Sequence, residues 1–246
     1  QGIKQGTEKE IAGETAGIGD KITKSELNAL CIEIGQETGI PISIEGIYRW
    51  MVFLPSAVDK RVPVPTRFYG LCDDGKVKMR GIEMRKSDTP LIVYRMQGEM
   101  FETLQDANDL GDFQRSIPRI IGILKRYAAK LGNGISAEEL LITKRLSKLD
   151  YSSAIPQSII SRKMLADGIN LRPGNSIQYI IRDIGAKAKE CKFVTREEFD
   201  GVFDRRKYAE LMVKAALVFL EPFGYTEGML YHLLGHERQL TIEECA

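Results

Sequence analysis

Two extended runs joined by an Asp-Asp-Gly turn constrain the fold of this chain most strongly. The runs Arg67–Cys72 and Lys76–Ile82 flank the turn Asp73-Asp74-Gly75. An acidic pair followed by glycine is typical of a β-hairpin turn, because glycine adopts positive φ without steric cost. We therefore predict an antiparallel strand pair, followed by a helix that begins at Thr89-Pro90. The exit of this hairpin concentrates charge in a few residues: Arg80, Glu83, Arg85, Lys86 and Asp88.

The composition is that of a soluble globular protein. The chain has 246 residues, 43% of them hydrophobic and 28% charged, which suffices for one large domain or two small ones. Its net charge of +1 gives no whole-chain electrostatic argument for nucleic acid, so any such signal must be local. Four scattered cysteines and no signal peptide favour free thiols in the cytoplasm and no zinc site. No apolar run approaches the roughly 20 residues of a membrane helix, so no membrane partner is expected.

The first half of the chain predicts a lead-in, helices and strands. Residues 1–23 are rich in Gly, Thr, Lys and Glu with little periodicity, which predicts a flexible lead-in. From Lys24 an apolar spacing predicts an amphipathic helix that ends near Gly39, and residues 42–54 read as a strand. The apolar stripe of that helix consists of Leu27, Leu30, Cys31 and Ile34. Two more helices are expected, one from Pro90 to Leu104 and one that ends at Gly132-Asn133-Gly134.

The second half is locally basic. Ser136 and Glu139 form a capping-box pattern before a short helix. Basic residues then far outnumber acidic ones: Lys144, Arg145, Lys148, Arg162, Lys163 and Arg172. We expect a helix from Pro156 to about Ala166 with Gly168 at its C-cap, and a strand over residues 177–181. A helix is predicted from Arg205, with a break near residues 222–224 and a last helix after it.

Four segments carry a resemblance to a known family. They are GKVKMRGIEMRKSDTP (75–90), LITKRLSKLDY (141–151), LADGINLRPGNSIQYII (165–181) and KYAELMVKAALVFLEPFGY (207–225). In this order and at this spacing they resemble the C-terminal part of archaeal family-B DNA polymerases. The resemblance implies an α+β fold, in which a short antiparallel palm-sheet fragment precedes a mostly helical thumb domain. The implied domains are the lead-in (1–23), the C-terminal palm segment (24–110) and the thumb (111–246).

The resemblance also implies which residues would face a primer-template duplex behind the polymerase active site. Arg80 and Lys86 match positions at which the family meets phosphates, and Gly81 would allow the backbone to approach closely. In the thumb, Thr143 and Lys144 stand at the family's Thr-Arg pair, Lys148 follows in the same loop, and Arg172 begins the family's Arg-Pro-Gly. Such contacts would be independent of base sequence and strongly dependent on salt.

One element departs from the family pattern. Where the family commonly has Lys-x-Tyr, this chain has Thr66-Arg67-Phe68, followed by Tyr69. The usual lysine contact with the primer end is therefore in doubt, and Arg67 and Tyr69 are the residues of this run that we expect at the DNA. Lys60 is an alternative to Arg67.

The parts of the family that carry out catalysis are missing from this sequence. Neither palm motif with metal-binding aspartates occurs, one of which is a Tyr-Gly-Asp-Thr-Asp turn. Metal-assisted phosphoryl transfer needs carboxylates that hold cations at the reacting phosphate. We therefore expect no catalytic residue, metal site or cofactor in this chain, and Mg²⁺ on a larger family-B polymerase subunit. The resemblance implies the small, DNA-gripping subunit of a split polymerase.

Two alternatives stay open. In the first, the chain is a catalytically inactive DNA-binding or assembly protein derived from a polymerase, and the altered Lys-x-Tyr element slightly favours this alternative. In the second, the chain is an excerpt of a single-chain polymerase. Whether the chain counts as an enzyme is left open with them.

Two short motifs near the C-terminus give weaker signals. His232 and His236 have the i, i+4 spacing of metal ligands, but the glutamate of HExxH and a third ligand are missing, so structural or exposed histidines are expected. Residues 239–242, Gln-Leu-Thr-Ile, are similar to the start of a sliding-clamp-binding motif. Cys245 and Ala246 stand in place of its two aromatics, so a sliding clamp is the weakest of the predicted partners.

Overall fold

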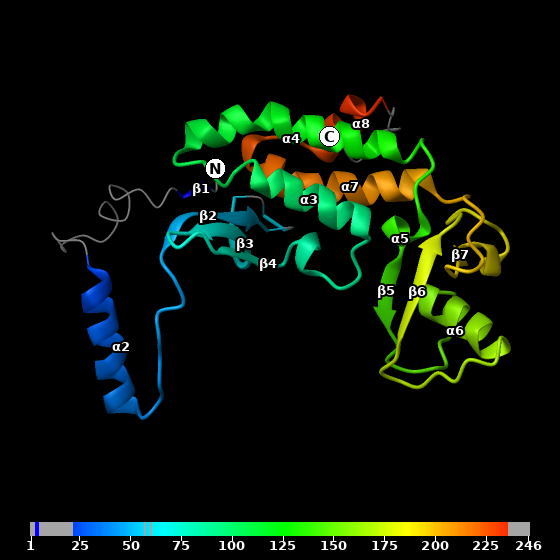
Figure 1. Cartoon of the computed structure of the whole chain (residues 1–246), viewed down its shortest axis with the longest axis horizontal. Coiled ribbons are helices and arrows are strands. Elements are labelled where there is room, and N and C mark those ends of the chain that lie inside the picture. The colour runs from blue at the N-terminus through cyan, green and yellow to red at the C-terminus, as the bar shows by residue number, and fades with distance from the viewer. Residues whose placement is uncertain (1–2, 5–21, 57, 60, 236–246) are drawn as a thin grey trace. The chain divides into compact units, whose positions relative to one another are not determined.

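The predicted α+β fold is confirmed by a computed structural model, in which two small antiparallel sheets accompany the helices (Figure 1). The structure describes residues 3–4, 22–56, 58–59 and 61–235. It forms two compact units, residues 1–81 with 105–115 and residues 82–104 with 116–246. These units are defined by packing, whereas the predicted palm and thumb are defined by resemblance, so the domain boundary at residues 110 and 111 stays a prediction.

The first unit contains a four-stranded antiparallel sheet in the order β1-β2-β3-β4. Strands β3 (Pro63–Cys72) and β4 (Val77–Arg80) form the predicted hairpin. Gly75 has φ of 79°, the left-handed conformation for which the turn needs glycine. Part of the expected lead-in is ordered, because β1 (Ile3–Lys4) pairs with β2 (Tyr48–Pro55) at the sheet edge.

One face of this sheet forms the core of the first unit. Trp50, Val52 and Leu54 alternate along β2 and are buried, and Tyr69 and Leu71 of β3 lie with them in the core. The Trp50 ring also packs edge-on against Phe113, with 4.9 Å between the ring centroids. Strand β2 begins later than predicted, and Gly46, a residue type that weakens strands, lies in the irregular segment before it.

Helix α2 (Lys24–Thr38) forms where the apolar spacing predicts it. Thr23 caps its N-terminus in a capping box with Glu26, and Gly39 ends it in the left-handed conformation, with φ of 69°. The predicted apolar stripe is not fully covered, because no residue of α2 is buried and Leu30 is 44% exposed. A helix of this length is marginal in water without tertiary packing. Its apolar stripe therefore needs cover that the described residues do not supply.

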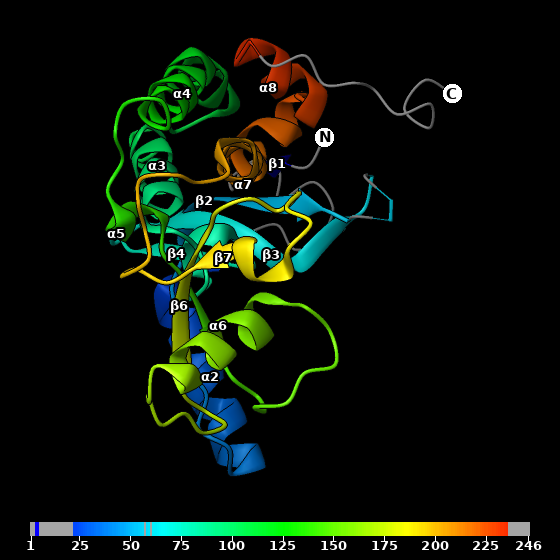
Figure 2. The ribbon, with the colours of Figure 1, turned by 90° about the vertical axis from the view of Figure 1, so that its right-hand side faces the viewer.

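The second unit is built on long helices. Helices α3 (Leu91–Glu102) and α7 (Arg205–Leu220) pack together. Helix α4 (Leu110–Lys130) belongs to this unit from Ser116 on, and the ion pair of Arg126 with Glu99 joins it to α3. Figure 2 shows these three as neighbouring helices seen nearly end-on. The turn η3 (Glu221–Phe223) makes the predicted break before α8 (Glu227–Leu233).

A three-stranded sheet in the order β5-β6-β7 completes the second unit. Its elements are α5 (Ala137–Leu140), β5 (Ile142–Arg145), α6 (Pro156–Ala166), β6 (Ser176–Ile181), η2 (Lys189–Cys191) and β7 (Phe193–Val194). The buried hydroxyl of Tyr208 joins this sheet to α7, since it donates to the carbonyl of Leu140 at 2.7 Å and accepts from the amide of Ile181 at 3.2 Å. The predicted capping box of α5 is wrong: the Ser136 side chain makes no cap hydrogen bond, and Glu139 pairs with Arg95 instead.

Candidate nucleic-acid interface

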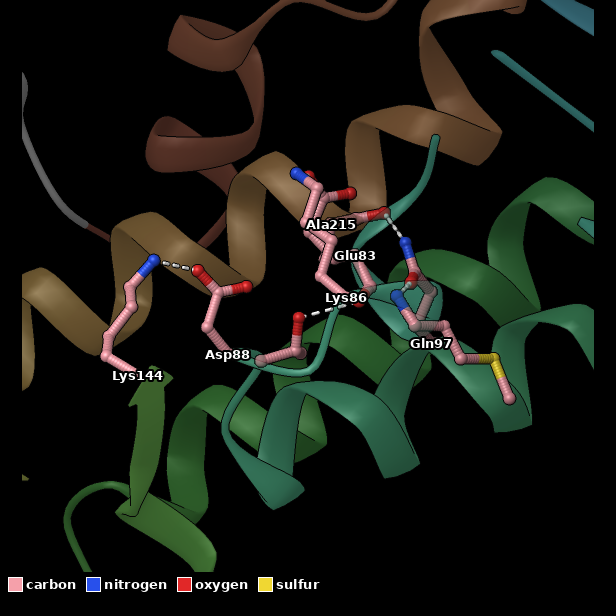
Figure 3. A network of polar contacts seen from close by, with 8 residues as sticks. Glu83, Lys86, Asp88, Gln97, Lys144 and Ala215 are labelled. Carbon is pink, nitrogen blue, oxygen red and sulfur yellow. Dashed lines mark hydrogen bonds and ion pairs between the residues drawn. The ribbon is translucent and has the colours of Figure 1, made fainter. Parts of the chain in front are cut away.

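The turn that follows the hairpin is fixed by a buried glutamine. This turn contains η1 (Glu83–Arg85). The side chain of Gln97 is fully buried; its Oε1 accepts from the amide of Met84 at 2.6 Å, and its Nε2 donates to the carbonyl of Ala215 at 2.9 Å (Figure 3). A buried amide with both ends bonded holds its partners in place, because releasing either would leave an unsatisfied polar group. Gln97 thus fixes the turn to helices α3 and α7.

Lys86 stands at the end of this turn with half of its side chain exposed. Its Nζ lies 2.8 Å from Glu83 Oε1, so Lys86 forms an ion pair with the residue three positions before it. The hydroxyl of Thr89 donates to the carbonyl of Glu83 at 2.6 Å and closes the turn. The carboxylate of Glu83 therefore orients Lys86 and partly offsets its charge, and the exposed ammonium remains accessible to a ligand.

Lys144 on β5 forms an ion pair with Asp88, which lies just beyond the turn. Both side chains are about one-third exposed, at 36% and 31%. The pair joins β5 to the segment that leads into α3. Lys144 is thus placed by an internal acid, and its charge is not fully available to an external phosphate.

A cluster of cations lies where β5 ends and β6 begins. Arg145 is the last residue of β5, opposite Ser176 of β6. The amide of Leu146 donates to the carbonyl of Asn175, and the amide of Gly174 donates to the carbonyl of Leu146 at 2.7 Å. These bonds bring the loop that contains Lys148 against the turn that contains Arg172. Arg145, Lys148 and Arg172 are all exposed, and we call these three residues the first basic surface.

Local contacts fix the backbone of this surface and leave its side chains outside. The amide of Arg172 donates to Asn175 Oδ1 at 2.7 Å, and the Nε of Arg145 donates to the carbonyl of Gly174 at 3.2 Å. The Lys148 ammonium lies 5.5 Å from the Tyr151 ring, a cation–π contact. Hydrogen bonding with the Ser147 side chain lowers the pKa of Tyr151. Ordered backbone with exposed cations is the arrangement that phosphate contacts require.

Two further cations of the basic segment, Arg162 and Lys163, have internal partners. Lys163 donates to the carbonyl of Phe193 and to both carboxylate oxygens of Glu198, and Arg162 donates to the hydroxyl of Ser158. Thr143 is partly exposed, and its hydroxyl accepts a long hydrogen bond of 3.4 Å from Gln178. The local excess of basic residues therefore overstates the number of cations that are available to DNA.

Four predicted site residues belong to the first unit. Arg80 is exposed at the end of β4, and Arg67 is partly exposed, with Nη1 3.5 Å from the carbonyl of Pro55. Gly81 has φ of 68°, and a Cβ there would lie 2.8 Å from Arg67 Cγ and 2.9 Å from the Thr66 carbonyl oxygen. Glycine at position 81 is therefore required by the close packing of β3, and a contact of its backbone with DNA stays a prediction.

The expectation that Tyr69 contacts DNA disagrees with this structure. Tyr69 has no exposed surface, its ring packs edge-on against Trp50, and burial raises the pKa of its hydroxyl. A side chain on the core face of a sheet cannot reach a ligand without unfolding its surroundings. We treat Tyr69 as a core residue.

The remaining sequence motifs add no site among the described residues. No group of three or more His, Cys, Asp or Glu side chains that could hold a metal ion is found there. His232 lies in the last turn of α8, whereas His236 and the Gln239–Ile242 motif lie outside the part of the chain that the structure describes. In the described ranges, no helix is both long and apolar enough to cross a membrane.

The sequence did not single out Gln97. A glutamine inside an amphipathic helix is usually read as a solvent-facing residue. The signal that could have found it is its position: it follows the apolar Met96, three residues before the apolar Met100, on the face of α3 that the pattern assigns to the core.

Comparison with known proteins relates most of the chain to archaeal DNA polymerases. No protein-family model matches it. A DNA polymerase of Pyrococcus glycovorans is 28% identical over 175 residues, which cover 68% of this chain and 22% of the relative. A DNA polymerase of Archaeoglobus fulgidus is 25% identical over 234 residues, which cover 85% of this chain and 27% of the relative. DNA polymerase 1 of Saccharolobus solfataricus is 28% identical over 197 residues, which cover 74% of this chain and 22% of the relative.

A solved structure shows the same fold. The family B DNA polymerase of the hyperthermophilic archaeon Pyrobaculum calidifontis matches with a TM-score of 0.57 and 20% identity, over 84% of this chain and 26% of that one. The chain is therefore related to archaeal family-B DNA polymerases over most of its length. It spans about a quarter of the length of these relatives.

Proposed function

We propose that this chain is the DNA-gripping part of a family-B DNA polymerase, which holds a primer-template duplex behind an active site supplied by a larger catalytic subunit. In this proposal the larger subunit binds Mg²⁺ and the reacting nucleotide, and the two subunits act together in the cytoplasm. The chain itself would bind and orient the duplex.

The first basic surface is the observation that carries the proposal. Its three exposed cations gather at one end of β5 and β6, in segments that resemble the thumb of these polymerases. Lys86 adds a fourth exposed cation on the ordered turn after the hairpin. Cations that point outward from ordered backbone suit phosphate oxygens, which every duplex presents alike. Binding should therefore be independent of base sequence and should weaken steeply as salt rises.

The uncovered stripe of α2 supports the larger subunit as a partner. Leu27, Leu30, Cys31 and Ile34 lie on one face of α2, and none of them is buried. An apolar surface on a short, well-capped helix is typical of an element that completes its core by association. The larger polymerase subunit is the proposed occupant, because the chain spans only about a quarter of its relatives.

DNA binding by the chain alone is the first test. Anisotropy of a labelled duplex would be measured against salt for the wild type and for Lys148→Gln/Arg172→Gln. Removal of two phosphate contacts should lower the slope of log K against log salt by roughly two and weaken all duplex sequences equally. An unchanged slope would remove both residues from the interface.

Primer extension distinguishes the proposal from its alternative. The chain would be mixed with the large polymerase subunit from the same genome, with each component alone as a control. Synthesis that appears or rises sharply only in the mixture supports a split polymerase. DNA binding without restored synthesis would instead favour an inactive DNA-binding or assembly protein, which the altered run Thr66-Arg67-Phe68 favours slightly.

A further inference from the structure

A second group of cations lies at the opposite end of β6 from the first basic surface. The loop of residues 182–192 follows β6, and Arg205 and Arg206 begin helix α7. Residues 182–192 and 204–207 together contain seven basic and three acidic residues. We call five of the basic residues the second basic surface: Lys187, Lys189, Lys192, Arg205 and Arg206. All are exposed except Lys192, which is partly exposed.

Backbone contacts hold the two parts of this surface together. The amide of Ile184 donates to Asp204 Oδ2 at 3.2 Å, and the amide of Asp204 donates to the carbonyl of Ile181 at 3.0 Å. The amides of Arg182 and Asp183 donate to the carbonyl of Lys192. The loop is therefore anchored to Asp204, the residue that precedes Arg205 and Arg206 at the start of α7.

The cations of the second basic surface are not used by the fold. Three neighbouring cations form internal ion pairs: Arg182 pairs with Asp200, Arg196 with Glu138, and Lys207 with Glu210. Within the described residues, by contrast, none of the five forms an ion pair or a side-chain hydrogen bond. Like charges gathered without internal partners repel one another, so a polyanion would stabilise them.

The surface suits an extended polyanion better than a small phosphate. The first turn of α7 would be the natural anion site, but Asp204 occupies it, because its side chain accepts from the amide of Lys207 at 2.9 Å. A phosphate at this helix end would therefore meet the negative charge of the Asp204 carboxylate. What remains is a spread of long, flexible side chains, which suits a charged backbone that passes over them.

Strand β6 sets the distance between the two basic surfaces. Arg172 precedes Ser176 at one end of the strand, and the loop that carries the second surface follows Ile181 at the other. Five residue steps at about 3.3 Å each span roughly 17 Å. Each strand of B-DNA advances about 3.4 Å per nucleotide along the axis, so the separation matches roughly five base pairs.

We propose that the second basic surface binds the phosphate backbone of the same duplex about five base pairs from the first basic surface. This inference rests on the proposed function. It assigns to residues outside the predicted thumb contacts a second, sequence-independent grip on the duplex.

The test compares three sets of neutralised cations in the full chain. The test variant is Lys187→Gln/Lys189→Gln/Lys192→Gln, whose backbone contacts are kept. The reference variant is Lys148→Gln/Arg172→Gln in the first basic surface. The matched control is Arg119→Gln/Lys125→Gln/Lys130→Gln on α4, which removes the same charge from a helix that belongs to neither surface. Thermal unfolding verifies that all three variants are folded. A fourth variant, Lys187→Arg/Lys189→Arg/Lys192→Arg, keeps the positive charges and so tests whether charge alone determines binding.

Salt titrations would use hairpin-closed duplex stems of about 3 and about 12 base pairs; the shorter is less than the proposed separation, and the longer exceeds one helical turn. On the long stem we expect the test variant to lower the salt slope by roughly two to three, while the control and the arginine variant leave it unchanged. On the short stem, which can fill one surface only, the effect of the test variant should shrink by at least half.

The outcomes separate this inference from the proposed function. An unchanged slope in the test variant, with a lower slope in the reference variant, overturns the second surface and leaves the proposed function standing. If neither variant changes the slope, both fail. If the test variant instead loses binding to the larger polymerase subunit and its salt slope for duplex binding is unchanged, the surface is a protein interface and the inference is overturned.

Discussion

The side-chain amide of Gln97 donates to the carbonyl of Ala215 at 2.9 Å and so joins helix α3 to a helix more than 100 residues further along the chain. Through its carbonyl oxygen the same side chain also accepts from Met84 at 2.6 Å. The turn that presents Lys86 is thus fixed from the protein interior.

Gln97→Leu should destabilise the chain strongly, because the amide of Met84 and the carbonyl of Ala215 would both lose their buried partner. Each unsatisfied group costs about 1–3 kcal/mol, so we expect a loss of about 2–5 kcal/mol in the free energy of unfolding. Urea denaturation measures this. The matched control is Gln178→Leu, an exposed glutamine whose loss should change stability by less than about 0.5 kcal/mol. Equal losses at the two positions would contradict the proposed anchor.

Gly81→Ala should be more harmful than Gly75→Ala. Both glycines have positive φ, 68° and 79°, so both alanine variants pay the cost of the left-handed conformation, about 1–2 kcal/mol. Only at Gly81 would the new Cβ also lie within 3 Å of Arg67 and Thr66, whereas nothing lies within 4 Å at Gly75. Thermal or urea unfolding of the two variants gives the comparison, and equal destabilisation would rule out the clash.

Asp88→Asn should raise duplex affinity at low salt. The substitution removes the acid that pairs with Lys144, which frees one ammonium and raises the local charge by one. We expect a salt slope steeper by about one, as for one additional phosphate contact. Lys144→Gln is the companion variant, in which affinity should fall. A lower affinity in Asp88→Asn would mean that Asp88 acts by positioning Lys144.

Unfolding should become easier above pH 10, in part through Tyr179. Burial, with a smaller contribution from the charge of Asp88, raises the pKa of Tyr179 to about 12. Tyrosine in the unfolded chain titrates near pH 10, so the neutral buried hydroxyl stabilises the fold fully below pH 10 and this stability is lost as pH rises to about 12. The loss from this group is about 1.4 kcal/mol per pH unit at most. In Tyr179→Phe the slope of the free energy of unfolding against pH should be shallower over this range, by an amount that corresponds to about one bound proton. An identical pH dependence in the two proteins would refute the assignment.

Substitutions in the α2 stripe should spare the isolated chain. Because no residue of α2 is buried, Leu30→Ser/Ile34→Ser should change the free energy of unfolding of the chain alone by less than about 0.5 kcal/mol. Binding to the larger polymerase subunit should fall at least tenfold, as measured by calorimetry. Asn28→Ser/Gln36→Ser, two exposed polar positions of the same helix, is the control. Strong destabilisation of the isolated chain would show that the stripe is already covered.

Local sequence signals predicted most of the elements. The Asp-Asp-Gly turn, the proline before α3, the glycines after α4 and the proline that begins α6 mark element ends because each acts through its own backbone conformation. The same logic failed where a second residue had to cooperate. Ser136 and Glu139 have the spacing of a capping box, but Arg95 from another helix takes the glutamate.

The candidate site was less predictable than the fold. The sequence indicated that residues 141–181 are basic, but it could not show that Lys163 is bound by Glu198 and Lys144 by Asp88, because these partners are distant in sequence. It also could not show that Tyr69 faces the core. A hydrophobic-polar alternation predicts two faces for a strand, and only its packing partners decide which face is buried.

By itself, the sequence determined the order and type of the elements and the resemblance to family-B polymerases, since both depend on short segments read in order. The tertiary structure decided which charges are available. Ion pairs and buried hydrogen bonds form between residues that only folding brings together, so the division of the cations into internal partners and two exposed basic surfaces could not be read from the sequence.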